Sequence, residues 1–145
     1  MNNVAMARAY VVQAVERIRH SEEAMERGNH PYVVRQCQEA VELLLKAALR
    51  LVGVEPPKWH DVGAILKSEV ERFPSWFRSE VPKLARISRK LRREREPAMY
   101  GDEESGLPPN ELYDEEDARE ALRWATQVFQ AVSKLFKELT GMDVQ

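Results

Sequence analysis

A cluster of cationic side chains is the part of this sequence whose residue types and spacing best suit chemistry. Between residues 86 and 95 one acid, Glu94, stands among six cations: Arg86, Arg89, Lys90, Arg92, Arg93 and Arg95. On a helix most of these side chains fall on two adjoining sides. Guanidinium groups bind phosphate through paired hydrogen bonds, so the cluster predicts a shared anion site. The residues expected to bind phosphate are Arg89, Arg92, Arg93, Arg95 and the nearby Tyr100.

The same cluster has a second interpretation. The cations approach the negative end of the expected helix, where positive charge is favoured in any case. Acids follow at residues 102–104 and can attract the arginines. In that reading the cluster is a solvated helix end without a ligand. The two readings differ in whether the guanidinium groups converge on one pocket.

A second set of polar residues lies further upstream. Gln38, Glu42 and Lys46 form a narrow polar edge on an otherwise apolar stretch, and His60 directly precedes Asp61. In one interpretation these residues line a cleft between helices or between protomers. Alternatively, Glu42 and Lys46 pair on the surface, as residues four apart on a helix often do. His60 would then brace the entry to a helix that Asp61 caps.

Several kinds of site are excluded by what the sequence lacks. It contains no glycine-rich phosphate loop and no dinucleotide-binding fingerprint. The single cysteine, Cys37, cannot form a cysteine-rich zinc site, and its place among apolar residues predicts packing in the core. We therefore predict no metal and no cofactor.

Composition limits the class of protein. The chain has 145 residues, of which 43% are hydrophobic and 32% charged, so we expect a single folded domain over residues 1–145. The net charge of −2 provides no global attraction to nucleic acid, so any such attraction has to be local. A lone cysteine fits a reducing, cytoplasmic location. No uninterrupted apolar stretch is long enough for a membrane span.

The elements that must position these residues are all predicted to be helices. Apolar residues at three- and four-residue steps predict helices from Val4 to about Gly28, over 32–52, after Asp61, from about Pro82, and from 114 to 141. Residues 96–112 hold two glycines and three prolines, which predicts a long loop. The expected fold is an all-α, antiparallel up-and-down bundle of four to five helices.

Residues 35–66, RQCQEAVELLLKAALRLVGVEPPKWHDVGAIL, resemble the core signature of the HEPN domain family. The matching elements are Gln38-Glu39-Ala40, then Glu42 and Lys46 along the helix, and the His60-Asp61 pair after a glycine-containing break. The helix expected from residue 114 is similar to the closing helix of the family. The resemblance covers about residues 5–137 and implies a helical bundle that often forms a homodimer with a cleft between protomers.

The resemblance also implies a type of activity. Many members of the family are metal-independent endoribonucleases, and many of those are toxins encoded beside a minimal nucleotidyltransferase partner. Their motif is an arginine, four to six residues, a histidine and often a tyrosine two places later. On this chain Arg93 takes the arginine place and Tyr100 the tyrosine place, but Ala98 stands where the histidine belongs. Registers starting at Arg89, Arg92 or Arg95 also lack the histidine.

Three functions follow from these observations. The first is a HEPN-like protein that binds nucleotide or RNA phosphates through the arginines without nuclease activity, because alanine cannot transfer the proton that RNA cleavage requires. The second is an endoribonuclease toxin with a nucleotidyltransferase partner, in which Arg93 and Tyr100 act. The third is a structural module whose helix faces bind another protein.

Overall fold

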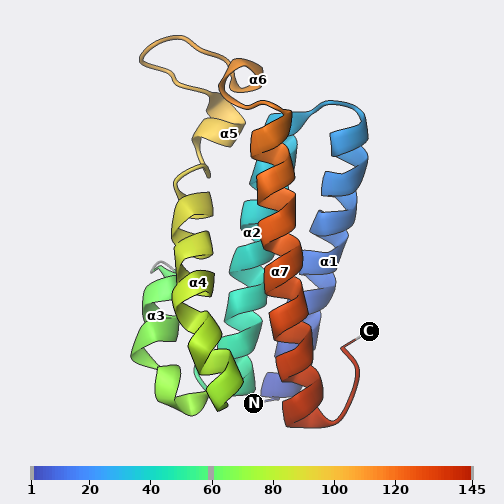
Figure 1. Ribbon diagram of the computed structural model, residues 1–145, viewed down its shortest axis with the longest axis vertical. Coiled ribbons are helices and arrows are strands. Elements are labelled where there is room, and N and C mark those ends of the chain that lie inside the picture. Colours follow the sequence, from blue (N-terminus) through green and yellow to red (C-terminus); the bar gives the residue numbers. More distant parts are fainter. Residues whose placement is uncertain (1, 59–60, 145) are drawn as a thin grey trace.

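The chain folds into a bundle of helices, which the computed structural model describes for residues 2–58 and 61–144. The elements in this range are α1 (Asn3–Glu26), α2 (His30–Leu51), α3 (Val62–Ser68), the 3-10 turn η1 (Val70–Arg72), α4 (Ser75–Arg92), α5 (Pro97–Tyr100), α6 (Pro109–Leu112) and α7 (Glu115–Thr140). Figure 1 shows α1, α2, α4 and α7 along the long axis of the molecule, with both termini at one end. The all-α, up-and-down bundle predicted from the sequence is confirmed. Because α5 and α6 are single turns, the remaining five α-helices agree with the four to five expected.

Helix α2 forms the centre of the bundle. It packs against α1 on one side and α7 on another, with α3, α4, α5 and α6 also in contact with it. Its apolar side chains cover a wide arc, and Cys37, Leu44, Leu45 and Leu49 are fully buried. A helix with so broad an apolar surface has to be covered on several sides. The polar edge that contains Gln38 and Glu42 is therefore narrow and lies between neighbouring elements.

Two aspartates define helix starts as the sequence predicted. Asp61 accepts a hydrogen bond of 2.9 Å from the backbone nitrogen of Gly63 at the start of α3. Asp114 accepts one of 2.9 Å from the nitrogen of Asp117, whose side chain accepts one of 3.0 Å from the nitrogen of Asp114. This reciprocal pair satisfies backbone donors that the first turn of α7 would leave unpaired.

The start of α4 differs from the prediction. The helix begins at Ser75, and Pro82 lies inside it instead of in its first turn. The additional turns bury Phe77 completely and bring its ring within 4.6 Å of that of Phe73, centroid to centroid. Burial of aromatic surface here outweighs the hydrogen bond that Pro82 cannot donate, which is why local proline chemistry placed the helix start too late.

Residues 96–112, predicted as a long loop, contain α5, α6 and an isolated bridge between Asp102 and Leu107. In Figure 1 this segment lies at the end of the bundle opposite the termini. Both short helices contact α2. The segment therefore brings Ala98 and its neighbours against the beginning of α2. Among the helices that the structure describes, none combines the length and apolar character that a membrane span requires.

Candidate functional site

The predicted arginine cluster is divided among different surfaces. Arg93 lines a pocket between α4 and α7, Arg95 lines a pocket beside α1 and α2, and Tyr100 lines a third next to α5. Arg89 and Arg92 line none of these three pockets. Because α4 ends at Arg92, the chain turns between Arg93 and Arg95 and directs them to different sides.

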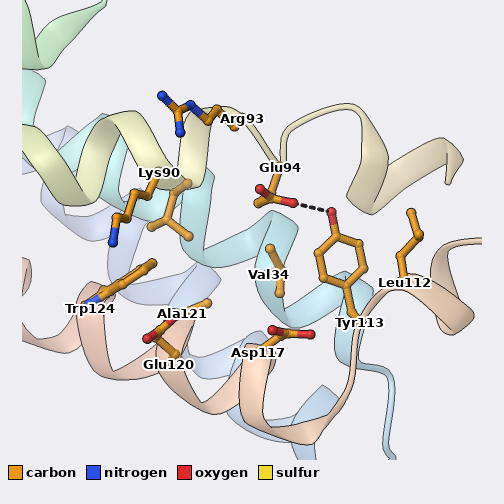
Figure 2. A pocket seen from close by; sticks show the side chains of 11 residues that line it. Val34, Lys90, Arg93, Glu94, Leu112, Tyr113, Asp117, Glu120, Ala121 and Trp124 are labelled. Atoms are coloured by element: carbon orange, nitrogen blue, oxygen red, sulfur yellow. Dashed lines mark hydrogen bonds between the residues drawn. The ribbon is translucent and has the colours of Figure 1, made fainter. Parts of the chain in front are cut away.

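The pocket between α4 and α7 has a volume of about 380 Å³ and carries charges of both signs. Lys90 extends from α4 toward Trp124 on α7, and its Nζ lies 5.7 Å from the ring centroid (Figure 2). In the same view Arg93 points away from Asp117 and Glu120. Two cations, Lys90 and Arg93, line this pocket together with three acids: Glu94, Asp117 and Glu120. The excess of acids does not favour a phosphate here.

One hydrogen bond joins two of the residues that line this pocket. The Tyr113 hydroxyl donates to Glu94 Oε1 at 2.7 Å (Figure 2). Burial and the neighbouring Glu94 carboxylate together raise the pKa of the Tyr113 phenol well above its usual range. Tyr113 therefore stays protonated at neutral pH and acts as a hydrogen-bond donor.

The pocket that contains Arg95 joins several of the predicted residues, and we call it the arginine pocket. It has a volume of about 240 Å³ and is lined by Arg17, Arg35, Gln38, Glu39, Glu42, Leu43 and Arg95. Its three guanidinium groups come from α1, α2 and the turn after α4. Arg95, Gln38 and Glu42 were predicted from the sequence, whereas Arg17 and Arg35 were missed. The spacing of Arg35 and Glu39, four apart on one helix, was a signal for one of these two.

Glu39 orients two of the three arginines. Arg17 Nε lies 2.9 Å from Glu39 Oε1, and Arg35 Nε lies 3.0 Å from Glu39 Oε2. Burial alone would raise the pKa of the Glu39 carboxyl, but the hydrogen bonds from the two arginines outweigh it and lower that pKa. Glu39 is thus ionised at neutral pH and holds both guanidinium groups in place.

The guanidinium groups keep donors for a ligand. Arg35 also donates from Nη1 to the backbone carbonyl of Arg95, and Arg17 donates from Nη1 to the carbonyl of Gln13 at 3.1 Å. Each arginine has five N–H groups, so both retain further donors on their terminal nitrogens. The arginine pocket therefore presents oriented guanidinium groups that are not fully used by the protein.

The other predicted cleft residues differ in their positions. Gln38 is 4% exposed, and its Oε1 accepts no hydrogen bond from the part of the chain that the structure describes. Lys46 Nζ lies 3.7 Å from Glu42 Oε2, so the predicted surface pair is present while Glu42 also lines the arginine pocket. His60 lies outside the described residues.

Ala98, at the place of the family histidine, lines a pocket of about 340 Å³ that we call the tyrosine pocket. Its lining residues are Asn29, Pro31, Tyr32, Arg35, Gln36, Glu39, Ala98, Met99 and Pro109. Arg35 and Glu39 also line the arginine pocket, so the two pockets are contiguous. Neither set of lining residues includes a histidine.

Tyr100 has a different environment. It is 61% exposed and lines a pocket with Glu96, Asp102, Glu103 and Glu104. Four carboxylates in one pocket repel a phosphate group. The tyrosine of the motif is therefore separated from the arginine pocket in both position and charge.

Comparison with known proteins agrees with the fold. The sequence profile of the HEPN domain matches residues 7–135. No protein with a curated description matches the chain. Its fold is similar to that in the crystal structure of TT1696 from Thermus thermophilus, with a TM-score of 0.72 and 23% sequence identity over 92% of this chain and 98% of the other. At that identity the likeness concerns the fold alone.

Proposed function

This chain belongs to the HEPN domain family, and from that premise we propose that it binds the phosphate groups of a nucleotide or of RNA without cleaving RNA. The proposed binding residues are Arg17, Arg35 and Arg95 in the arginine pocket. Of the arginines predicted from the sequence, Arg95 is in this pocket, and Arg89, Arg92 and Arg93 add positive charge at longer range.

The observation that carries the proposal is the convergence of three arginines from separate elements on one pocket. Two of them are held in place by Glu39, so little side-chain freedom remains to be lost when a ligand binds. The pocket contains three guanidinium groups against two carboxylates, and one of these, Glu42, is itself paired with Lys46. The local charge favours an anion.

The absence of cleavage is proposed on the chemistry at residue 98. RNA cleavage of this type requires a group that transfers a proton near neutral pH. Ala98 has no such group and is 5% exposed. Tyr100 is no substitute, because it lies among acids that exclude the phosphate. For its setting we propose a cytoplasmic homodimer. A minimal nucleotidyltransferase partner belongs to the alternative function, an endoribonuclease toxin.

Binding of a labelled single-stranded RNA at low salt, followed by fluorescence anisotropy, tests the proposal. Arg95→Gln is the cleanest variant, because no ion pair of the Arg95 side chain is present among the described residues. We expect its affinity to fall roughly tenfold, the effect of losing one charge-assisted hydrogen bond. Arg35→Gln should reduce affinity further, since it also removes one of the two ion pairs that neutralise the Glu39 carboxylate. Lys83→Gln is the matched control, since it removes one positive charge from an exposed residue of α4 that lines neither the arginine pocket nor the tyrosine pocket.

Unchanged affinity in all three pocket variants, Arg17→Gln, Arg35→Gln and Arg95→Gln, would refute the binding site. The RNA recovered from each reaction should run intact on a denaturing gel. Cleavage that requires Arg93, or growth arrest on expression that Arg93→Ala abolishes, would instead favour an endoribonuclease toxin.

A further inference from the structure

The arginine pocket continues into a surface of different character. Arg35 and Glu39 line both it and the tyrosine pocket, so the two pockets adjoin along α2. The tyrosine pocket adds Tyr32, Met99 and two prolines to the surface beside the arginines. A phosphate group at one end would thus have an apolar surface at the other.

Two large side chains of the tyrosine pocket are exposed to solvent. Tyr32 is 38% exposed and Met99 is 48% exposed. A single exposed apolar residue needs no explanation, but these two lie together beside a cationic pocket. Tyr32 precedes Arg35 by three residues on α2, a spacing that places their Cβ atoms about 5–6 Å apart on the same face. An aromatic ring and a guanidinium group therefore face one ligand-sized space.

An aromatic side chain next to clustered cations is the combination that binds single-stranded nucleic acid, because the cations hold the backbone while a base stacks on the ring. Resting on the proposed function, we infer that Tyr32 is the platform on which the base of the bound nucleotide stacks while its phosphate contacts Arg17, Arg35 and Arg95. The ligand class is accordingly a base-bearing nucleotide or single-stranded RNA, and not a phosphosugar or free phosphate.

This inference assigns the aromatic contact to Tyr32 and not to the tyrosine of the family motif. Tyr100 is more exposed, yet the four acids around it repel the phosphate that a stacked nucleotide would carry. Tyr32 instead adjoins Arg35. The Nε of Arg35 is paired with Glu39, but its terminal nitrogens keep N–H donors for a ligand. The two tyrosines form a matched pair for an experiment.

The experiment compares two short oligomers with the same sugar-phosphate backbone, one carrying adenine and one abasic. Calorimetric titration at low salt uses the wild type, Tyr32→Ala, Tyr32→Phe, Tyr100→Ala and Arg95→Gln. We expect the wild type to bind the adenine oligomer roughly five- to a hundredfold more tightly than the abasic one. Tyr32→Ala should lose this preference and bind the abasic oligomer as the wild type does. Tyr32→Phe, which keeps the ring, and Tyr100→Ala should keep the preference.

The outcomes separate this inference from the proposed function. Arg95→Gln should lower the affinity for both oligomers by the same factor. Equal wild-type affinity for the two oligomers would overturn the stacking role of Tyr32 and leave the arginine pocket standing. A preference that survives in Tyr32→Ala, or that disappears in Tyr100→Ala, would also overturn it. If the wild type binds neither oligomer, the proposed function fails and the inference fails with it.

Discussion

The hydroxyl of Tyr113 donates a 2.7 Å hydrogen bond to Glu94, and so links the turn after α4 to the residue that precedes the cap of α7. Glu94 is the one acid within the cationic stretch 86–95. Its carboxylate points toward Tyr113, while Arg93 points away from Asp117 and Glu120 on the other side of the pocket (Figure 2). This bond thus joins the turn after α4 to the start of α7.

Loss of this bond should destabilise the protein. Tyr113→Phe keeps the buried ring but leaves the Glu94 carboxylate without its donor, and we expect the free energy of unfolding to fall by about 1–2 kcal/mol. Urea denaturation followed by circular dichroism measures this change. Tyr100→Phe is the control. Because Tyr100 is 61% exposed, this variant should have the same free energy of unfolding as the wild type. Equal stability of Tyr113→Phe and the wild type would contradict the role of the bond.

The lowered pKa of Glu39 predicts a dependence of stability on pH. The folded state holds the Glu39 carboxylate ionised to lower pH than the unfolded chain does, because Arg17 and Arg35 donate to it. Its contribution is therefore fully present at neutral pH and is lost as the pH falls below about 4.3, where the unfolded chain takes up the proton first. Glu39→Gln should be less stable than the wild type at pH 7 and should lose less stability on acidification.

Urea denaturation at a series of pH values tests this prediction. Glu80→Gln is a suitable control, because Glu80 is exposed on α4 and appears in no ion pair of the described residues. A Glu39→Gln curve that stays parallel to that of the wild type down to acidic pH would show that the two arginines do not stabilise the carboxylate.

Cys37 should be chemically inert in the folded protein. Burial raises the pKa of its thiol to about 12, despite a 3.6 Å contact with the Ser21 hydroxyl. Because the thiolate is the reactive form, a thiol reagent should label Cys37 at pH 8 only as fast as the bundle opens. Labelling should become immediate in denaturant, which serves as the control. Fast labelling under native conditions would indicate that α1 and α2 separate readily around this side chain.

The sequence predicted the fold better than it predicted the site. The apolar periodicity of α2 and α7 is strong, because each of these helices buries a long stripe. The start of α7 follows from the acids at 114–117, and that of α2 from the stop at Gly28 and the early proline Pro31. The start of α4 was missed because the burial of Phe77 is a tertiary effect that overrides the proline signal. Short-range patterns do not contain that information.

The arginine pocket was only partly predictable for a related reason. Sequence proximity grouped Arg93 with Arg95, yet the end of α4 separates them, and Arg95 instead meets Arg17, which is 78 residues away in the chain. Nothing in the spacing of α1 residues signals this contact, since it depends on how α1 packs against α2. The polar edge with Gln38 and Glu42 was predictable, because it follows from the periodicity of one helix.

The last prediction concerns the segment that brings Ala98 against α2. Gly101 has φ +77° and ψ −164°, a conformation that only glycine adopts readily. A Cβ atom at this position would collide with the carbonyl oxygen of Leu107 and lie 3.1 Å from backbone atoms of Pro108. That carbonyl accepts a 2.9 Å hydrogen bond from the nitrogen of Asp102, so Gly101→Ala should break the bridge that closes the loop.

Gly106 provides a matched comparison within the same loop. Its φ is +75°, but no atom lies within 4 Å of an added Cβ, so Gly106→Ala should cost about 1 kcal/mol from the backbone conformation alone. Gly101→Ala should cost about 3 kcal/mol or more, because the clash adds to the backbone term. Hydrogen exchange of the amides of Asp102 and Leu107 measures both effects locally. Equal loss of protection in the two variants would mean that the Leu107 carbonyl moves aside without cost.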